Sequence, residues 1–196
     1  MERTAAADLV RLITVGHGLV GAEAFAALLR GADVTSVVDV RTAPGSRRNP
    51  AFGRAELEHW LPDHGVAYRW ERRLGGFRRP VDQSPNTALR HAGFRGYADH
   101  MRSAEFADAL DGVVAEARRG AADRDPALAS VMCSESVWWR CHRRLIADAV
   151  VLLRGVEVSH LMHDGRVVPH RITTGARVGE DGLLVYGDGA DRLPGT

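Results

Sequence analysis

Short apolar runs alternate along this chain with stretches of helical periodicity, and this alternation constrains the fold more than any other feature. The first apolar run covers residues 12–15, and apolar side chains then recur at helical spacing over 24–29. A second apolar run follows over 34–40. A strand, a helix and a strand in this order predict two parallel strands joined by a right-handed crossover.

The same alternation continues through most of the chain. Further strands are predicted at 66–70, 128–132 and 156–162, and further helices at 55–61, 97–101, 104–118 and 137–153. We therefore predict a three-layer, Rossmann-like α/β fold with a mainly parallel sheet of about five strands and flanking helices. Residues 1–175 are predicted to form one domain. The Gly- and Asp-rich residues 176–196 are predicted to be a C-terminal extension with a weak hairpin.

Composition excludes several classes of protein. A formal net charge of +1 gives no overall attraction to nucleic acid or to a membrane surface, and no apolar run is long enough to span a bilayer. Two cysteines are too few for a disulfide scaffold, and the first residues do not resemble a secretory signal. We therefore expect a cytoplasmic protein with no membrane partner, whose cysteines are free thiols or metal ligands.

Five chemically reactive side chains fall within eleven positions, where the predicted fourth strand runs into a helix. They are Cys133, Glu135, Cys141, His142 and Arg143. In an open parallel sheet, ligands bind beyond the carboxyl ends of the strands. His17 follows the first strand and Arg41 the second, so both are expected to join the cluster if the first and fourth strands are neighbours.

Three interpretations of this cluster are open. In the first, Cys133 is a nucleophile whose pKa is lowered by a helix N-terminus and nearby cations, Glu135 and Arg143 balance charge, and His17 or His142 transfers protons. In the second, Cys133, Cys141 and His142 bind zinc or iron. In the third, both cysteines are small buried groups, and Glu135 and Arg143 form a supporting salt bridge.

The charge at the start of the predicted helix points to an anion. Arg140, His142, Arg143 and Arg144 all fall in its first turns, where cations oppose the helix dipole. A bound phosphate or carboxylate, or an ionised side chain, would relieve this conflict. We therefore predict an anionic or phosphorylated small-molecule ligand. The predicted ligand-binding residues are Arg41, Ser46, Arg47, Asn49, Arg95 and Arg143.

A nucleic-acid-binding module is a further alternative, with these arginines on the phosphate backbone. Stacking faces would come from aromatic side chains, namely Trp60, Tyr68, Trp70, Phe77 and Tyr97.

Several of these residues, taken in order, resemble the family known as domain of unknown function 488 (DUF488). The shared motifs are Thr14-Val15-Gly16-His17, Val38-Asp39-Val40-Arg41, the loop with Pro44, Ser46, Asn49, Pro50 and Phe52, Leu74-Gly75-Gly76, Phe94 to Tyr97, Cys133 with Glu135, Cys141 to Arg143, His160 and His170. The resemblance covers residues 12–170 and implies an α/β fold without an established activity. Within it, we assign structural roles to Gly16 and Asp39.

A dinucleotide-binding fingerprint competes with that resemblance. Residues 16–21 fit the pattern G-x-G-x-x-G after a strand, and Asp39 lies at the distance expected of a ribose-binding acid. The family pattern keeps only the first glycine and His17. NAD(P) binding is therefore a minority interpretation.

Overall fold

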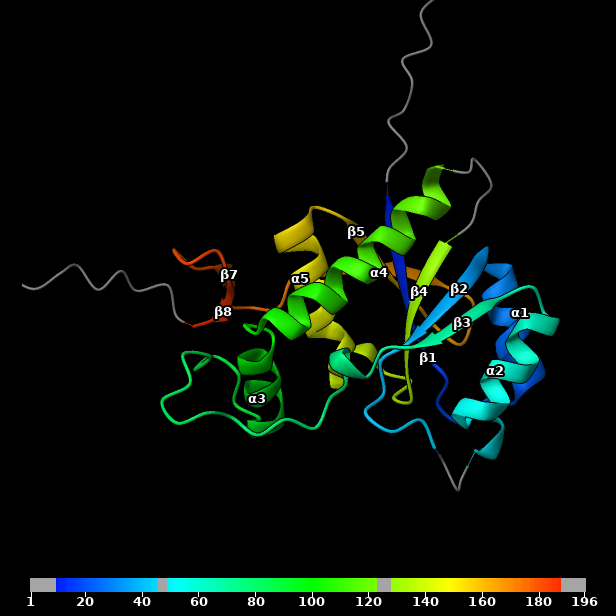
Figure 1. The fold of residues 1–196 in the computed structure, drawn as a ribbon, viewed down its shortest axis with the longest axis horizontal. Coiled ribbons are helices and arrows are strands. Elements are labelled where there is room, and N and C mark those ends of the chain that lie inside the picture. Colours follow the sequence, from blue (N-terminus) through cyan, green and yellow to red (C-terminus); the bar gives the residue numbers. More distant parts are fainter. Residues whose placement is uncertain (1–9, 46–48, 123–127, 188–196) are drawn as a thin grey trace, which may run out of the picture.

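The computed structural model describes residues 10–45, 49–122 and 128–187 of the chain (Figure 1). Its strands are β1 (Arg11–Gly16), β2 (Val34–Asp39), β3 (Ala67–Trp70), β4 (Leu128–Cys133), β5 (Glu157–Leu161), β6 (Val167–Pro169), β7 (Ala176–Val178) and β8 (Leu184–Tyr186). Its α-helices are α1 (Ala22–Gly31), α2 (Arg54–Asp63), α3 (Ala92–His100), α4 (Ala104–Ala122) and α5 (Arg143–Arg154). Short 3-10 helices are η1 (Pro50–Phe52), η2 (Arg72–Leu74) and η3 (Trp138–Arg140).

Six strands form one sheet in the order β3-β2-β4-β1-β5-β6, and the first five of these run parallel. The chain passes from β1 to β2 on one side of the sheet and from β4 to β5 on the other. The connection that leaves β1 runs toward one edge of the sheet, and the connection that leaves β4 runs toward the other edge. The neighbouring strands β1 and β4 therefore flank the topological switch point of the sheet. Crevices at such a switch point are where open α/β sheets bind ligands.

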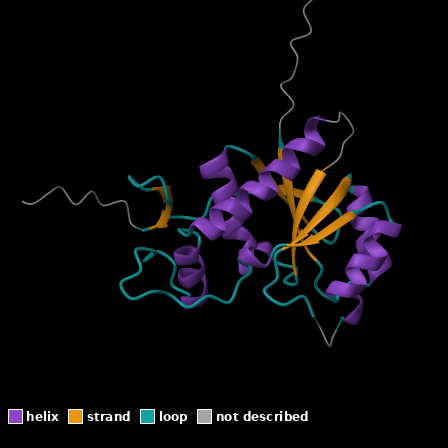
Figure 2. Ribbon diagram, in the orientation of Figure 1, coloured by secondary structure: helices purple, strands orange, loops and turns teal. Residues whose placement is uncertain are grey.

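Helices cover both faces of the sheet, which confirms the predicted three-layer α/β fold (Figure 2). Alternate side chains of β1 enter different cores: Leu12 packs with residues of α4 and α5, while Ile13 packs with Phe25 of α1 and Leu57 of α2. This alternation is the period-two pattern of a strand buried on both faces. The apolar runs of the sequence therefore became the central strands.

The sixth strand was not predicted. β6 pairs antiparallel with β5 at the edge of the sheet, after a turn in which Gly165 has φ of 83°. Asp164 and Gly165 form an Asp-Gly pair, which is the typical sequence of a tight hairpin turn. That pair is the signal by which the sequence could have revealed this strand.

The predicted helix over 137–153 is wrong at its start. Cys141 has extended backbone angles, φ −120° and ψ 152°, and separates η3 from α5, which begins at Arg143 with His142 as its N-cap. Arg140 and His142 therefore precede the helix instead of lying in its first turns. The break matters for function, because it places Cys141 outside the helix.

The last two strands form an antiparallel hairpin that packs against α3 and α5. Tyr186 is fully buried, and its hydroxyl donates a 2.9 Å hydrogen bond to Asp148 of α5. Leu184 packs in the same core. Among the described residues, no helix combines the length and apolar character that a membrane crossing requires.

Candidate functional site

The carboxyl ends of β1 and β4 meet at the switch point, as expected for neighbouring parallel strands. Gly16 and Cys133 are partners in the register of the two strands. Beyond them, the backbone N–H of His17 donates to the carbonyl of Cys133 at 3.1 Å, and that of Gly18 donates to Ser134 at 3.0 Å. These two amides are consequently not available to a pyrophosphate, which counts against the dinucleotide interpretation of residues 16–21.

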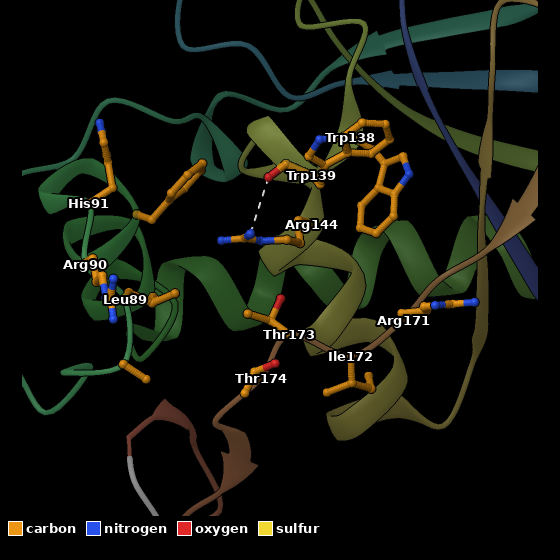
Figure 3. Close-up of a pocket in the computed structure, with 12 residues that line it drawn as sticks. Leu89, Arg90, His91, Trp138, Trp139, Arg144, Arg171, Ile172, Thr173 and Thr174 are labelled. Atoms are coloured by element: carbon orange, nitrogen blue, oxygen red, sulfur yellow. Dashed lines mark hydrogen bonds between the residues drawn. The ribbon is translucent and has the colours of Figure 1, made fainter.

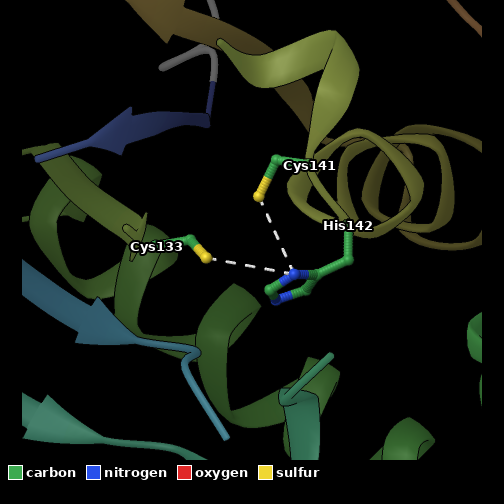
Figure 4. Close-up of side chains that lie close together, drawn as sticks. All are labelled: Cys133, Cys141 and His142. Carbon is green, nitrogen blue, oxygen red and sulfur yellow. Dashed lines mark hydrogen bonds between the residues drawn. The ribbon is translucent and has the colours of Figure 1, made fainter. Parts of the chain in front are cut away.

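Cys133, Cys141 and His142 converge at this edge of the sheet (Figure 4). Their two sulfur atoms and one ring nitrogen lie within 4.8 Å of one another. Nδ1 of His142 lies 4.0 Å from Sγ of Cys133 and 3.7 Å from Sγ of Cys141. The residues come from the end of β4 and from the residues that lead into α5, so the break before that helix creates the cluster.

The ring of His142 is held in one orientation. Nε2 lies 3.1 Å from the carbonyl oxygen of Val40, which only accepts hydrogen bonds, so this nitrogen carries the proton. In the neutral ring, Nδ1 then presents its lone pair to both sulfur atoms. The sequence pointed to His142, but it gave no indication that the backbone of Val40 sets its tautomer.

The two thiols differ in acidity. A hydrogen bond from the Cys133 thiol lowers the pKa of Cys141, and the charge and the backbone N–H of Arg143 act in the same direction. The same hydrogen bond, together with burial, raises the pKa of Cys133. That Cys133 carries the activated thiol therefore stays a prediction, and the lowered pKa favours Cys141, which lies nearer to the helix start and to Arg143.

The salt bridge between Glu135 and Arg143 that belongs to the third interpretation is not formed in the structure. The Arg143 guanidinium is almost fully buried and donates to the backbone carbonyl of Glu135 and, at 3.3 Å, to the hydroxyl of Thr14. The Glu135 carboxylate accepts from the backbone N–H of Val137 at 3.0 Å. A Cβ at Gly16 would lie 1.9 Å from the Glu135 carbonyl oxygen. Only glycine therefore allows the end of β1 to lie this close to the backbone of Glu135.

These contacts change the interpretation of the cations at the helix start. Of the four predicted to oppose the dipole, only Arg143 and Arg144 lie in the first turn of α5. The Arg143 guanidinium donates to two neutral acceptors, the carbonyl of Glu135 and the hydroxyl of Thr14. An anionic ligand near this helix start therefore stays a prediction.

Asp39, Arg41 and His17 form a separate buried network beside the cluster. Nε and Nη2 of Arg41 donate to the Asp39 carboxylate at 2.9 and 2.5 Å, and Nη1 lies 3.3 Å from Nε2 of His17. The ring of His17 stacks on Phe52. Burial and the charge of Arg41 lower the pKa of His17 to about 4, so His17 is neutral near pH 7.

A cavity of about 560 Å³ opens beside the cysteines, within the size range of small-molecule sites. Of the predicted site residues, it is lined by Arg41, Cys133, Glu135, Cys141 and His142. Lining residues that the sequence analysis did not assign to this site include Gly76, Phe77, Tyr97 and Arg140. Gly76 belongs to the motif Leu74-Gly75-Gly76, which is one of those in which the chain resembles DUF488. That motif could have indicated that this segment lies at the site.

The remaining predicted residues lie elsewhere. His17, Asn49, Arg95 and Arg143 are not among the described residues that line the cavity. Nδ2 of Asn49 donates to the carbonyl of Val20 at 3.1 Å, and Arg95 is half-buried in α3. Ser46 and Arg47 lie outside the described residues.

A buried series of hydrogen-bonded side chains connects Arg143 at the start of α5 with Asp148 in the same helix. The hydroxyl of Thr14 lies 2.7 Å from Nδ1 of His160, Nε2 of His160 lies 3.0 Å from His170, and His170 lies 2.9 Å from the carboxylate of Asp148. Burial and the charges of His170 and Arg143 lower the pKa of His160 to about 3. The folded protein therefore keeps this imidazole neutral where the unfolded chain takes up a proton.

Because His160 is kept neutral in the folded protein, we expect the free energy of unfolding to fall as the pH is lowered below about 6.5. Between there and pH 4, His160 alone should remove about 1.4 kcal/mol of unfolding free energy for each pH unit, because only the unfolded state binds its proton. Urea unfolding at several pH values measures this slope. His160→Gln should reduce this slope by about 1.4 kcal/mol per pH unit. The control His59→Gln, at an exposed histidine, should leave the slope unchanged. Equal slopes in the wild type and both variants would contradict a neutral His160 in the folded protein.

A family model described as "Domain of unknown function DUF488" matches residues 21–150 of the chain. The matched span covers more than half of the chain and contains the cysteine and histidine cluster as well as Asp39 and Arg41. No curated protein and no solved structure matches the chain.

Proposed function

Because this chain belongs to the DUF488 family, a domain of unknown function, its activity has to be inferred from its own residues, and we propose that Cys133, Cys141 and His142 bind one zinc ion. In this proposal the zinc centre serves an enzyme that acts on an anionic small molecule in the adjoining cavity. The observation that carries it is the orientation of His142. Its protonated nitrogen is tied to a backbone carbonyl, and its lone pair faces two sulfur atoms. Metal-binding histidines are typically oriented in this way.

The spacing of the donor atoms supports a metal of this size. In a tetrahedral zinc site, with Zn–S of about 2.3 Å and Zn–N of about 2.0–2.1 Å, bound sulfur and nitrogen atoms lie about 3.6 Å apart. The two sulfur–nitrogen distances here are 4.0 and 3.7 Å. Thiolate and imidazole ligands together favour zinc, and ferrous iron is the other metal that we include in the tests.

Three protein ligands leave one position for water or substrate, which is typical of catalytic zinc. When bound, zinc polarises a substrate oxygen or supplies an activated water. The cavity supports an anionic substrate through Arg140, whose exposed guanidinium forms no hydrogen bond or ion pair with any described residue. Arg41 contributes less, because its guanidinium already contacts Asp39 and His17.

Two alternatives have weaker support. A thiol-dependent enzyme using Cys133 conflicts with the raised pKa and the burial of that thiol. A nucleic-acid module with the predicted stacking residues has less support, because Tyr97 is buried, Trp60, Tyr68 and Trp70 are half-buried, and only Phe77 of the five is fully exposed. A cytoplasmic location belongs to the same proposal, since a reducing compartment keeps both thiols available.

Metal reconstitution tests the proposal. Chelator-treated, reduced protein is incubated with zinc or with ferrous iron without oxygen, desalted, and submitted to elemental analysis and to titration with a thiol-reactive dye. We expect about one zinc per chain and protection of both thiols, which are the only two cysteines of the chain. Less than stoichiometric amounts of both metals, with both thiols still reactive, would overturn the proposal.

Gly76 offers a more local test. A Cβ at this position would lie 3.0 Å from Nδ1 of His142, the nitrogen that faces the sulfur atoms. Gly76→Ala should therefore weaken zinc binding about tenfold, a change of about 1.4 kcal/mol, because the methyl group crowds the metal-binding nitrogen. Competition titration with a chromophoric chelator measures the affinity.

Gly45→Ala is the matched control, because Gly45 lines the same cavity and a Cβ there meets no atom of the described residues within 4 Å. Its zinc affinity should equal that of the wild-type protein. Equal affinities for Gly76→Ala and Gly45→Ala would show that His142 does not bind the metal through Nδ1.

A further inference from the structure

A second cavity, of about 500 Å³, adjoins the first one (Figure 3). The two cavities share His91 and Phe94 as lining residues. The second cavity is otherwise bounded by η3, the start of α5 and the segment 171–174. None of the proposed zinc ligands lines it.

The charge of this second cavity is one-sided. Arg90, Arg144 and Arg171 line it, and none of the described lining residues is acidic. Arg144 extends across the cavity from α5, where its Nη1 lies 3.3 Å from the carbonyl oxygen of Trp139 (Figure 3). Arginine clusters without carboxylate partners are typical of phosphate sites.

Two buried polar atoms of the same cavity have no protein partner. Among the described residues, Nε of Arg144 and Oγ1 of Thr173 are both buried without a hydrogen bond. Leaving such a group unpaired is unfavourable. Both residues line the cavity, so a ligand that pairs these atoms after a shift of their side chains would be favoured.

Aromatic rings form another wall. Trp139 lines the cavity and is 49% exposed. Its neighbour Trp138 is already stacked on His160, with ring centroids 3.9 Å apart. Phe94 is covered by the Arg144 guanidinium, 4.9 Å from the ring centroid. Trp139 contacts Trp138 in a T-shaped pair, with ring centroids 5.5 Å apart, and its exposed surface remains available for a planar group to stack.

We propose that this second cavity binds a phosphorylated nucleoside, with the base stacked on Trp139 and the phosphate bound by Arg144 with Arg90. The ligand is either a free nucleotide or the end of a single-stranded nucleic acid, since both present a base and a phosphate. This proposal does not rest on the zinc centre, because no zinc ligand lines the cavity.

The test uses metal-free, full-length protein and isothermal titration with four probes. These are adenosine 5′-monophosphate, adenosine, inorganic phosphate and a single-stranded ten-residue oligodeoxyadenylate. We expect the monophosphate to bind at least tenfold more tightly than adenosine or phosphate alone. Trp139→Ala and Arg144→Gln should each weaken its binding at least fivefold. Arg118→Gln, an exposed arginine on α4, should change it less than twofold.

The arms of the test separate the two sources of the ligand. An oligonucleotide that binds more than tenfold tighter than the monophosphate, with affinity that falls steeply with salt, identifies the end of a strand as the ligand. Comparable affinities identify a free nucleotide. Either result supports the proposed chemistry. Equal binding of phosphate and the monophosphate, no effect of Trp139→Ala, or no binding of any probe at millimolar concentration would overturn it.

Discussion

Replacing Asp39 by alanine is expected to lower the free energy of unfolding by about 3–5 kcal/mol, because it leaves a buried guanidinium without its counter-ion. The Asp39 carboxylate is fully buried and accepts hydrogen bonds from the backbone and side chain of Arg41 and from the hydroxyl of Tyr68. Arg41 itself is only 6% exposed. Urea unfolding monitored by circular dichroism measures the loss.

Two further variants show which contact carries the effect. Tyr68→Phe removes only one hydrogen bond to Asp39 and should cost about 1 kcal/mol. The double variant Asp39→Ala/Arg41→Met removes both charges and should be more stable than Asp39→Ala alone. A single Asp39→Ala protein within 1 kcal/mol of wild type would mean that the pair is not buried as described.

Alanine at any one of Cys133, Cys141 or His142 is expected to weaken zinc binding about a hundredfold. Structural zinc sites with four ligands bind with about 10–16 kcal/mol, so one ligand accounts for about 3 kcal/mol. Chelator competition with each purified variant measures the loss. His59→Ala removes an exposed histidine of α2 and should leave the affinity unchanged.

The pattern of these losses separates zinc binding from thiol chemistry. A metal centre requires all three residues, so the three alanine variants should lose similar affinity. If His142→Ala binds zinc as tightly as wild type while the cysteine variants do not, the two thiols bind metal without the histidine, and the proposed three-ligand site is wrong.

Much of the fold followed from the sequence because its strands are buried on both faces. The runs at 12–15, 34–40 and 128–132 are mostly apolar and form the central strands β1, β2 and β4. Neighbouring parallel strands end at one edge, so the position of Cys133 beside residues 16–18 was also predictable. The edge strand β6 was missed because its short hairpin has no comparable apolar run.

The site was only partly predictable, because its decisive contacts are made by the backbone. The extended residue Cys141 interrupts a segment whose periodicity indicates one continuous helix. Arg143 donates to the carbonyl of Glu135 where the sequence suggested a carboxylate partner. The carbonyl of Val40 orients His142 across about a hundred residues of chain. Residue types alone do not specify such contacts. The reactive residue types of Cys133, Cys141 and His142 did, however, identify the three side chains that converge in the structure.

X-ray absorption at the zinc edge of the reconstituted protein tests the proposed centre most directly. The three-ligand site predicts a first shell with two sulfur atoms at about 2.3 Å and nitrogen or oxygen at about 2.0–2.1 Å, one of them from an imidazole. The sulfur contribution should halve in Cys133→Ala and in Cys141→Ala. A first shell of nitrogen and oxygen atoms only would contradict zinc binding by Cys133, Cys141 and His142.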